Sequence, residues 1–314
     1  MKALVTTYFL PGTMLLAVLF AVAMNATSFQ QEPPPPTGPV APTTPSRAFA
    51  AYWFAGKAEL NAYRLHQAHY GHLNPGKAVL IFVTEDFRTD LQVKSETEAT
   101  RHQATPVLKL NLIRKFNTGS YDYSLYTSTF TPLRSADFPA TLKVSTSGQE
   151  WCGHSYLQMN YRSGGYRVSG RSYFEQEVAE EYEIGKALLE DELWNRIRLS
   201  PNKLPTGPLQ VVPGTQTARL RHQKLEPMAA TATLTDYGGT AFGGKAPRAY
   251  QLTYQGDGRT LVIVFENAFP HRILGWEETY KTNNRLLTSR AVLDKTVQLD
   301  YWNRNLPADS ILHL

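Results

Sequence analysis

The chemically reactive residue types that stand closest together in the sequence are Glu150, Cys152 and His154. On a strand, alternate side chains share a face, so all three side chains could converge. A thiolate activated by an imidazole, with a carboxylate orienting the imidazole, is the arrangement of a cysteine nucleophile. One Cys, one His and one Glu can also bind zinc, although a structural zinc site normally uses four protein ligands. The three residues are therefore candidate catalytic residues.

The competing interpretation is that Cys152 is a small core residue, because free cysteine is among the most buried residue types. Burial away from cations raises the pKa of a thiol and makes it inert. We expect this second arrangement, with the thiol packed between aromatic neighbours such as Trp151 and Tyr156. His154 would then be a structural histidine rather than a general base.

A second candidate is the segment 239–246 (GTAFGGKA), which nearly matches a phosphate-binding loop. Ala246 stands where such a loop has the Ser or Thr that contacts magnesium. Pro247 and a strand-like run follow, in place of the helix that this motif requires. We therefore expect a glycine-rich loop without nucleotide binding.

A third candidate is the series His66, His69 and His72, which recurs every three residues and suggests a metal site. On a strand, His66 and His72 would face one way and His69 the other. We expect exposed histidines of a hairpin instead. The sequence contains no G-x-S-x-G, H-E-x-x-H or EF-hand motif, and it indicates neither a metal nor a cofactor.

The composition of the chain limits the class of protein in which these residues stand. The chain has 314 residues, and its net charge of +5 is dispersed, with no run of five Lys or Arg that would form a nucleic-acid groove. One cysteine excludes an internal disulfide. The many aromatic residues favour strands, where rings pack on pleated surfaces.

The N-terminal segment predicts export. Residues 1–24 have a positive start at Lys2 and an apolar run over 14–24, and Ala21 and Ala23 stand where a signal peptidase reads small residues. Cleavage after Ala23 or Ala26 would give an extracytoplasmic protein of the periplasm or envelope. The alternative is an uncleaved anchor, which would be the chain's only membrane contact. No cysteine follows for lipid attachment.

Three regions are predicted. A signal peptide or anchor spans residues 1–24, a proline-rich linker spans 25–48, and a single β-rich domain spans 49–314. Prolines 33–36 favour an extended polyproline II spacer, which cannot build a packed core.

The domain is predicted to be mainly β, an antiparallel curved sheet or barrel-like body with one main helix near 186–199. In 107–114 (VLKLNLIR) the leucines share one face, and turn signals stand at 74–76 (NPG) and 256–258 (GDG). In 186–199 apolar residues recur at helical spacing, with acids early and arginines late. Strands are expected over 58–68, 77–87, 107–114, 121–131, 141–145, 149–161, 166–184, 209–212, 229–236, 248–255 and 259–266, with two short strands in 288–301.

Four stretches also resemble a family of secreted proteins and lipoproteins from Gram-negative bacteria: 81–87 (IFVTEDF), 115–124 (KFNTGSYDYS), 147–154 (SGQEWCGH) and 269–278 (FPHRILGWEE). Members of this family are often labelled "septum formation inhibitor Maf", after a cytoplasmic nucleotide pyrophosphatase. This chain lacks that enzyme's Ser-x-x-Arg-Arg opening and its alternating α/β layout. The resemblance thus implies export and assigns no residue a role.

Two functions remain open. The first is a noncatalytic envelope domain that binds an apolar small molecule in a cavity, or another envelope protein at its surface. The second is a thiol-dependent hydrolase centred on Cys152 and His154. A Maf-like nucleotide pyrophosphatase is a further alternative, and it rests on the family label alone.

Overall fold

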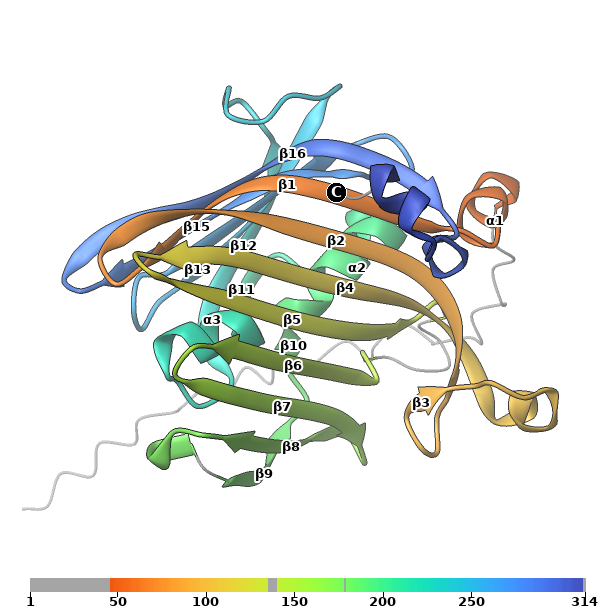
Figure 1. Cartoon of the computed structure of the whole chain (residues 1–314), viewed down its shortest axis with the longest axis horizontal. Helices are drawn as coiled ribbons and strands as arrows, with labels where there is room; N and C mark the ends of the chain where they lie inside the picture. Colours follow the sequence, from red (N-terminus) through yellow and green to blue (C-terminus); the bar gives the residue numbers. More distant parts are fainter. Residues whose placement is uncertain (1–45, 135–139, 178, 313–314) are drawn as a thin grey trace, which may run out of the picture. The chain divides into compact units, whose positions relative to one another are not determined.

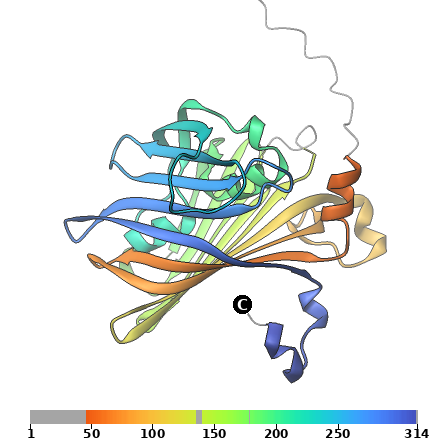
Figure 2. The ribbon, with the colours of Figure 1, turned by 90° about the horizontal axis from the view of Figure 1, so that it is seen from above.

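A computed structural model describes residues 46–134, 140–177 and 179–312, and within these ranges sixteen strands join one sheet. The sheet is dominated by antiparallel pairs and is strongly curved without closing into a barrel (Figures 1 and 2). The parallel pair is β10 with β11. The prediction of a mainly β, antiparallel curved sheet is confirmed.

The elements follow one another with short connections. The helices are α1 (Arg47–Trp53), α2 (Leu193–Leu199) and α3 (Thr215–Arg221). The strands are β1 (Ala58–His69), β2 (His72–Arg88), β3 (Val93–Lys94), β4 (Ala104–Thr118), β5 (Tyr121–Pro132), β6 (Lys143–Glu150), β7 (Gly153–Arg162), β8 (Gly165–Ser172), β9 (Ala179–Gly185), β10 (Leu188–Leu189), β11 (Gly207–Val212), β12 (Met228–Asp236), β13 (Pro247–Tyr254), β14 (Thr260–Glu266), β15 (Ile273–Thr282) and β16 (Arg285–Leu299).

Across the sheet the strands run β10-β11-β12-β13-β14-β15-β16-β1-β2-β4-β5-β6-β7-β8-β9, and β3 pairs with β2 off this path. The strands curve around α2 and α3, so that the two helices fill the concave side (Figure 1). Leu193, Trp194 and Ile197 of α2 pack into one buried cluster with Leu110 of β4 and Leu252 of β13. The core of the domain is therefore the concave face of one sheet, closed by helices.

The prediction of one main helix near 186–199 is wrong in length, since α2 has seven residues, as α1 and α3 also have. Residues 188–189 form β10, Glu190–Glu192 form a 3-10 turn, and α2 begins only at Leu193. Glu190, Asp191 and Glu192 are all buried. The acids of the first predicted turn therefore do not face solvent, because buried polar partners bind them inside the sheet.

The predicted turn at Asn74-Pro75-Gly76 is wrong, because these residues lie inside β2. The chain reverses at Tyr70-Gly71, where both residues have positive φ, the sign pattern of a type I′ hairpin turn. A Cβ at Gly76 would lie 2.3 Å from the carbonyl oxygen of Lys115, so this glycine permits the close approach of β4. The turn at 256–258 is confirmed between β13 and β14.

The C-terminal prediction is also wrong in detail, since one long strand, β16, replaces two short ones. β15 was not predicted, although it lies in the middle of the sheet. The predicted region 1–24 and residues 25–45 of the predicted linker 25–48 lie outside the described residues. Helix α1 begins at Arg47, just before the expected end of the linker. Among the helices that the structure describes, none has the length and apolarity to span a membrane.

A buried ion pair connects α2 to the sheet. The guanidinium of Arg198 donates to both carboxylate oxygens of Glu59 on β1, at 2.5 and 2.6 Å, and both side chains are fully buried. Nε of Arg198 donates to the carbonyl of Pro270, and the guanidinium lies 4.7 Å from the ring centre of Phe82. Burial alone would raise the pKa of Glu59, but Arg198, together with hydrogen bonds from Tyr52 and Asn61, lowers it overall.

We predict that Arg198→Leu lowers the free energy of unfolding by about 3–5 kcal/mol, because it leaves the Glu59 carboxylate buried without a cation. Adding Glu59→Leu should restore part of the loss, because both buried charges are then gone. Urea unfolding of the two single variants and the double variant measures the coupling.

The control is the exposed pair Arg64–Asp294, whose atoms lie 3.8 Å apart. The corresponding substitutions there should cost less than about 1 kcal/mol. If the losses in the free energy of unfolding caused by the substitutions at Glu59 and Arg198 simply add in the double variant, the stabilising role of the pair is contradicted.

Candidate functional site

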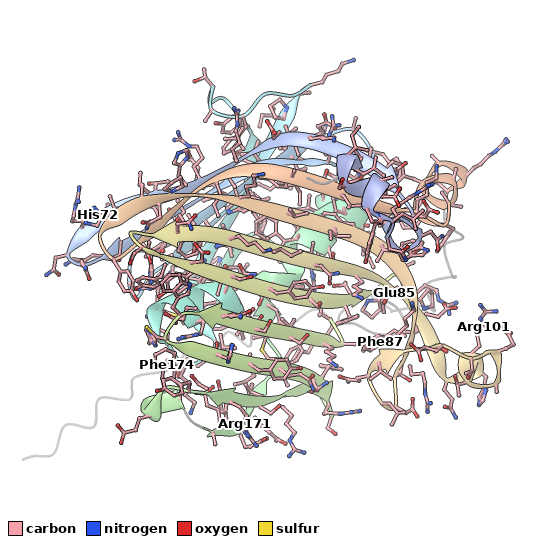
Figure 3. All side chains as sticks on the ribbon, in the orientation of Figure 1. His72, Glu85, Phe87, Arg101, Arg171 and Phe174 are labelled. Atoms are coloured by element: carbon pink, nitrogen blue, oxygen red, sulfur yellow. The ribbon has the colours of Figure 1, made fainter. Side chains whose placement is uncertain are left out.

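Most of the described hairpin turns meet at one end of the sheet, which we call the hairpin end. The connections there include the turns β1–β2, β4–β5, β6–β7, β13–β14 and β15–β16, the β11–β12 connection that carries α3, and the connection from β8 to β9 (Figure 1). Figure 3 places His72 and Phe174 at this end and Arg101 at the opposite one. Two of the four family-like stretches, 115–124 and 147–154, cover the β4–β5 and β6–β7 turns.

The structure separates the three candidate catalytic residues. Trp151 and Cys152 form the two-residue turn between β6 and β7, and Cys152 is exposed, so the predicted buried thiol is wrong. Glu150 pairs with Gly153 across the hairpin, and His154 pairs with Gln149, which places Glu150 and His154 on opposite faces. The predicted convergence fails because a turn interrupts the expected strand.

An aromatic collar surrounds Glu150 at the hairpin end. Its members lie in or directly beside four of these connections and are Tyr70, Tyr121, Trp151, Tyr173 and Phe174. Tyr121 and Trp151 lie with ring centres 6.3 Å apart, and Tyr173 and Phe174 5.9 Å apart. A Cβ at Gly153 would lie 2.7 Å from ring carbons of Tyr173, so this ring lies directly against the backbone of β7.

Within the collar lies a charged cluster centred on Arg219, at the C-terminal end of α3. Its guanidinium donates to Glu150 at 2.8 Å and to Glu177 at 3.4 Å, and it lies 4.6 Å from the ring centre of Phe174. Glu177 also lies 2.7 Å from Nδ1 of His222, the left-handed residue that ends α3. Two carboxylates therefore hold one arginine and one imidazole in fixed positions.

Gly148 lies beside this cluster. A Cβ there would clash with Oγ of Ser155 at 2.8 Å and would make an ordinary contact with Nε of Arg219 at 3.5 Å. The missing side chain therefore makes room for the hydroxyl of Ser155.

Behind the cluster, His69 and Tyr123 form its buried side. Nε2 of His69 lies 3.4 Å from the hydroxyl of Tyr123, which lies 2.8 Å from that of Tyr70. Burial, together with the nearby His222 and Arg219, lowers the pKa of His69 to about 4. His69 is therefore neutral at neutral pH.

A pocket of about 250 Å³ continues from this cluster between α3 and β6–β9, and we call it the α3 pocket. Its hydroxyl groups come from Thr146, Ser155, Ser172 and Thr215. Its charged residues include Arg219, His222, Glu177, Glu180 and Lys224. Burial and the neighbouring Glu177 raise the pKa of Glu180.

The floor of the α3 pocket is fixed by hydrogen bonds. The Thr146 hydroxyl lies 2.5 Å from that of Thr215 and 2.7 Å from that of Thr127. The amide of Thr215 donates to Oδ2 of Asp191 at 2.9 Å, which attaches the start of α3 to the 3-10 turn before α2. The two elements that line the pocket here, β6 and α3, are therefore held in place by hydrogen bonds of the packed fold.

Asp191 is buried. Its pKa rises to about 7, mainly because of burial and also because of the neighbouring Glu190, while the hydrogen bond from Thr215 opposes the rise. Glu190 itself receives both terminal nitrogens of Arg259 at 2.6 Å, and Nε of Arg259 donates to Glu278 at 2.8 Å.

The hydrogen bonds of Ser172 bear on whether it could act as a nucleophile. Its hydroxyl donates to Glu177 at 3.3 Å and accepts from the amide of Phe174. A nucleophile needs a base within hydrogen-bond reach, and the base beside Ser172 is this carboxylate, which is also bound to Arg219 and His222. The pocket thus provides fixed donors, acceptors and hydroxyls.

The structure also places the histidine series and the glycine-rich segment that the sequence offered as candidate sites. His66 and His72 are exposed as expected, whereas His69 is buried, which corrects its prediction. The described residues contain no group of three or more His, Cys, Asp or Glu that could hold a metal. Residues 239–246 form a glycine-rich loop between β12 and β13, as expected, with Phe242 buried against the outside of the sheet.

Sequence reasoning missed Arg219, Glu177 and His222. Their partners are distant in sequence, since Arg219 and Glu150 are 69 residues apart. The available signal was Gly153 beside Trp151, because a glycine in a predicted strand, here 149–161, indicates close approach by other groups. Comparison with protein-family models, with curated proteins and with solved structures found no match to the chain.

We predict that Asp191→Asn becomes increasingly stabilising, relative to the natural chain, as the pH rises from 5 to 8. The folded pKa of about 7 lies above the ordinary 3.8, so the folded state binds this proton more tightly than the unfolded state does. The resulting stability is present at low pH and is lost as the pH rises through 7. The difference between the two proteins should grow by about 2–3 kcal/mol, as chemical unfolding at each pH would measure. A pH-independent difference would contradict the prediction.

Proposed function

We propose that this chain is a noncatalytic binding domain of the cell envelope, located outside the cytoplasm, that holds a small polar ligand in the α3 pocket. The observation that carries the proposal is the pocket's lining, in which hydroxyls and charged groups converge on fixed elements. Pockets with a few convergent polar groups are the usual sites of small-molecule binding.

The lining supports a polar ligand over the apolar one that the composition suggested. The concave face, where an apolar cavity was expected, is filled by Leu193, Trp194 and Ile197 of α2. The α3 pocket has Leu157 and Ala218 among its lining, but charged and hydroxyl side chains outnumber such apolar residues. A partner protein at the surface remains the alternative for the same noncatalytic class.

The enzymatic alternatives have less support. A thiol hydrolase needs Cys152 beside a base, whereas Glu150 is bound to Arg219 and His154 lies on the other face of the hairpin. A nucleotide pyrophosphatase of the Maf type would have an alternating α/β layout, and the sheet here is mainly antiparallel.

We expect compounds from a library of small polar molecules to raise the melting temperature of the full chain. Leu157→Trp should abolish this response, because an indole on the floor of the α3 pocket occupies the ligand's space. The matched control is Gln158→Trp on the next residue of β7, which faces the other side of the sheet. The measurement is thermal unfolding with and without each compound. An equal response of both variants, or no response of the natural chain, would contradict ligand binding in this pocket.

The extracytoplasmic part of the proposal depends on residues 1–24. We expect the mature chain to begin between Met24 and Thr27 and to fractionate outside the cytoplasm, because signal peptidase reads the small residues at Ala21 and Ala23 or the following Ala26. N-terminal sequencing after cell fractionation, with a cytoplasmic enzyme as marker, measures this. Recovery of Met1 from the soluble cytoplasmic fraction would refute export.

A further inference from the structure

Two rings of the aromatic collar are far more exposed than packing requires. Trp151 is 72% exposed and Tyr173 is 74% exposed. Each is nevertheless supported on one side, Trp151 by Tyr121 and Tyr173 by the backbone at Gly153. A supported ring with its remaining surface in water can gain free energy by packing against a ligand.

The rings stand beside the polar groups of the α3 pocket. Phe174, the neighbour of Tyr173, lies 4.6 Å from the guanidinium of Arg219 and has its ring centre 5.6 Å from that of His222. Trp151 directly follows Glu150, the other partner of Arg219. A ligand at this end could therefore contact apolar ring surface and fixed hydrogen-bonding groups together.

The site holds charged groups of both signs, which bears on the charge of the ligand. Arg219 is shared by Glu150 and Glu177, and Glu180, Lys224 and Arg171 also line the pocket. An anionic ligand would meet three carboxylates, and a cationic ligand would compete with Arg219 for them. A neutral ligand avoids both costs, and it can use the remaining lone pairs of the carboxylates and the pocket hydroxyls.

We propose that the ligand is a neutral saccharide. This inference rests on the proposed function and specifies the chemical class of its ligand. A pyranose ring has an apolar face of C–H groups and an edge of hydroxyls that both donate and accept. The face fits the exposed surface of Trp151 or Tyr173, and the hydroxyls fit the carboxylates and hydroxyls of the α3 pocket.

The same chemistry is present in a free sugar and in one residue of a glycan chain. The position of Trp151 and Tyr173 on two neighbouring connections allows either source, since each ring can accept its own sugar unit. The two sources can be distinguished, because only binding of a glycan chain strengthens as the chain becomes longer.

The test is isothermal titration calorimetry of the full chain with glucose, galactose, N-acetylglucosamine and short linear oligomers of each. Trp151→Ala and Tyr173→Ala should each weaken binding by about tenfold or more, because each removes a stacking surface. Both side chains are exposed, so the melting temperature should stay unchanged. Trp151→Phe should retain most of the affinity. The control is Leu286→Ala, 69% exposed on the β15–β16 hairpin, which should bind as the natural chain does.

Affinity that is equal for monomers and oligomers would support a free sugar, and affinity that grows with length would support a glycan. The proposal is overturned if no saccharide binds, or if Trp151→Ala and Tyr173→Ala bind as tightly as the natural chain. It is also overturned if these two variants lose binding to vesicles of phosphatidylethanolamine and phosphatidylglycerol instead, because the collar would then be a membrane contact.

These failures are distinguishable from failure of the proposed function. A charged or nonsaccharide compound that stabilises the natural chain but not Leu157→Trp would refute the saccharide and leave polar-ligand binding in place. If no compound of any class stabilises the natural chain, both fail.

Discussion

The fold depends on pairing the charges that enter the concave side of the sheet. An open, curved sheet leaves this side to be filled by other elements, and here α3 and the turn and helix over 190–199 fill it. These segments carry Glu190, Asp191 and Arg198 into the interior, where an unpaired charge would cost several kcal/mol. Each of them has a partner from a different part of the chain.

This pairing fixes the position of the helices as apolar packing alone would not. Apolar contacts tolerate small displacements, whereas the bidentate contact of Arg259 with Glu190 holds only in one geometry. Glu278 joins Arg259 to β15, and the Thr217 hydroxyl of α3 donates to the same carboxylate at 2.7 Å. The network therefore positions α3, and α3 positions Arg219 and His222 at the hairpin end. The preorganisation of the candidate site is a consequence of the charges in the core.

The sequence predicted the parts of the fold that depend on local pattern. The leucines of β4 alternate, and Leu108, Leu110 and Leu112 are buried on one face as that pattern requires. Predictions failed where a distant partner overrides the local signal. The acids at 190–192 have the spacing of a helix start, but Arg259 and the amide of Thr215 bind two of them inside the sheet. Asn74-Pro75-Gly76 has turn composition, yet these residues lie in β2. There the side-chain amide of Asn74 donates to the backbone carbonyls of Gln67 and His69 on β1.

The candidate site was predictable only in part, for the same reason. The stretch 147–154 identified the correct hairpin, but alternation placed Cys152 in a strand, and nothing local indicates that Trp151 and Cys152 form its turn. The identity of the turn residues is informative in itself. A two-residue turn at the surface does not require a tryptophan, and an exposed indole contributes little to folding because its area stays in water. A glycine at position 153 likewise makes the strand less stable than a residue with a side chain would, but it leaves space for Tyr173. Since the fold gains little from either residue, the exposed pair of supported rings beside a polar pocket supports the proposal of a ligand site at this end of the sheet.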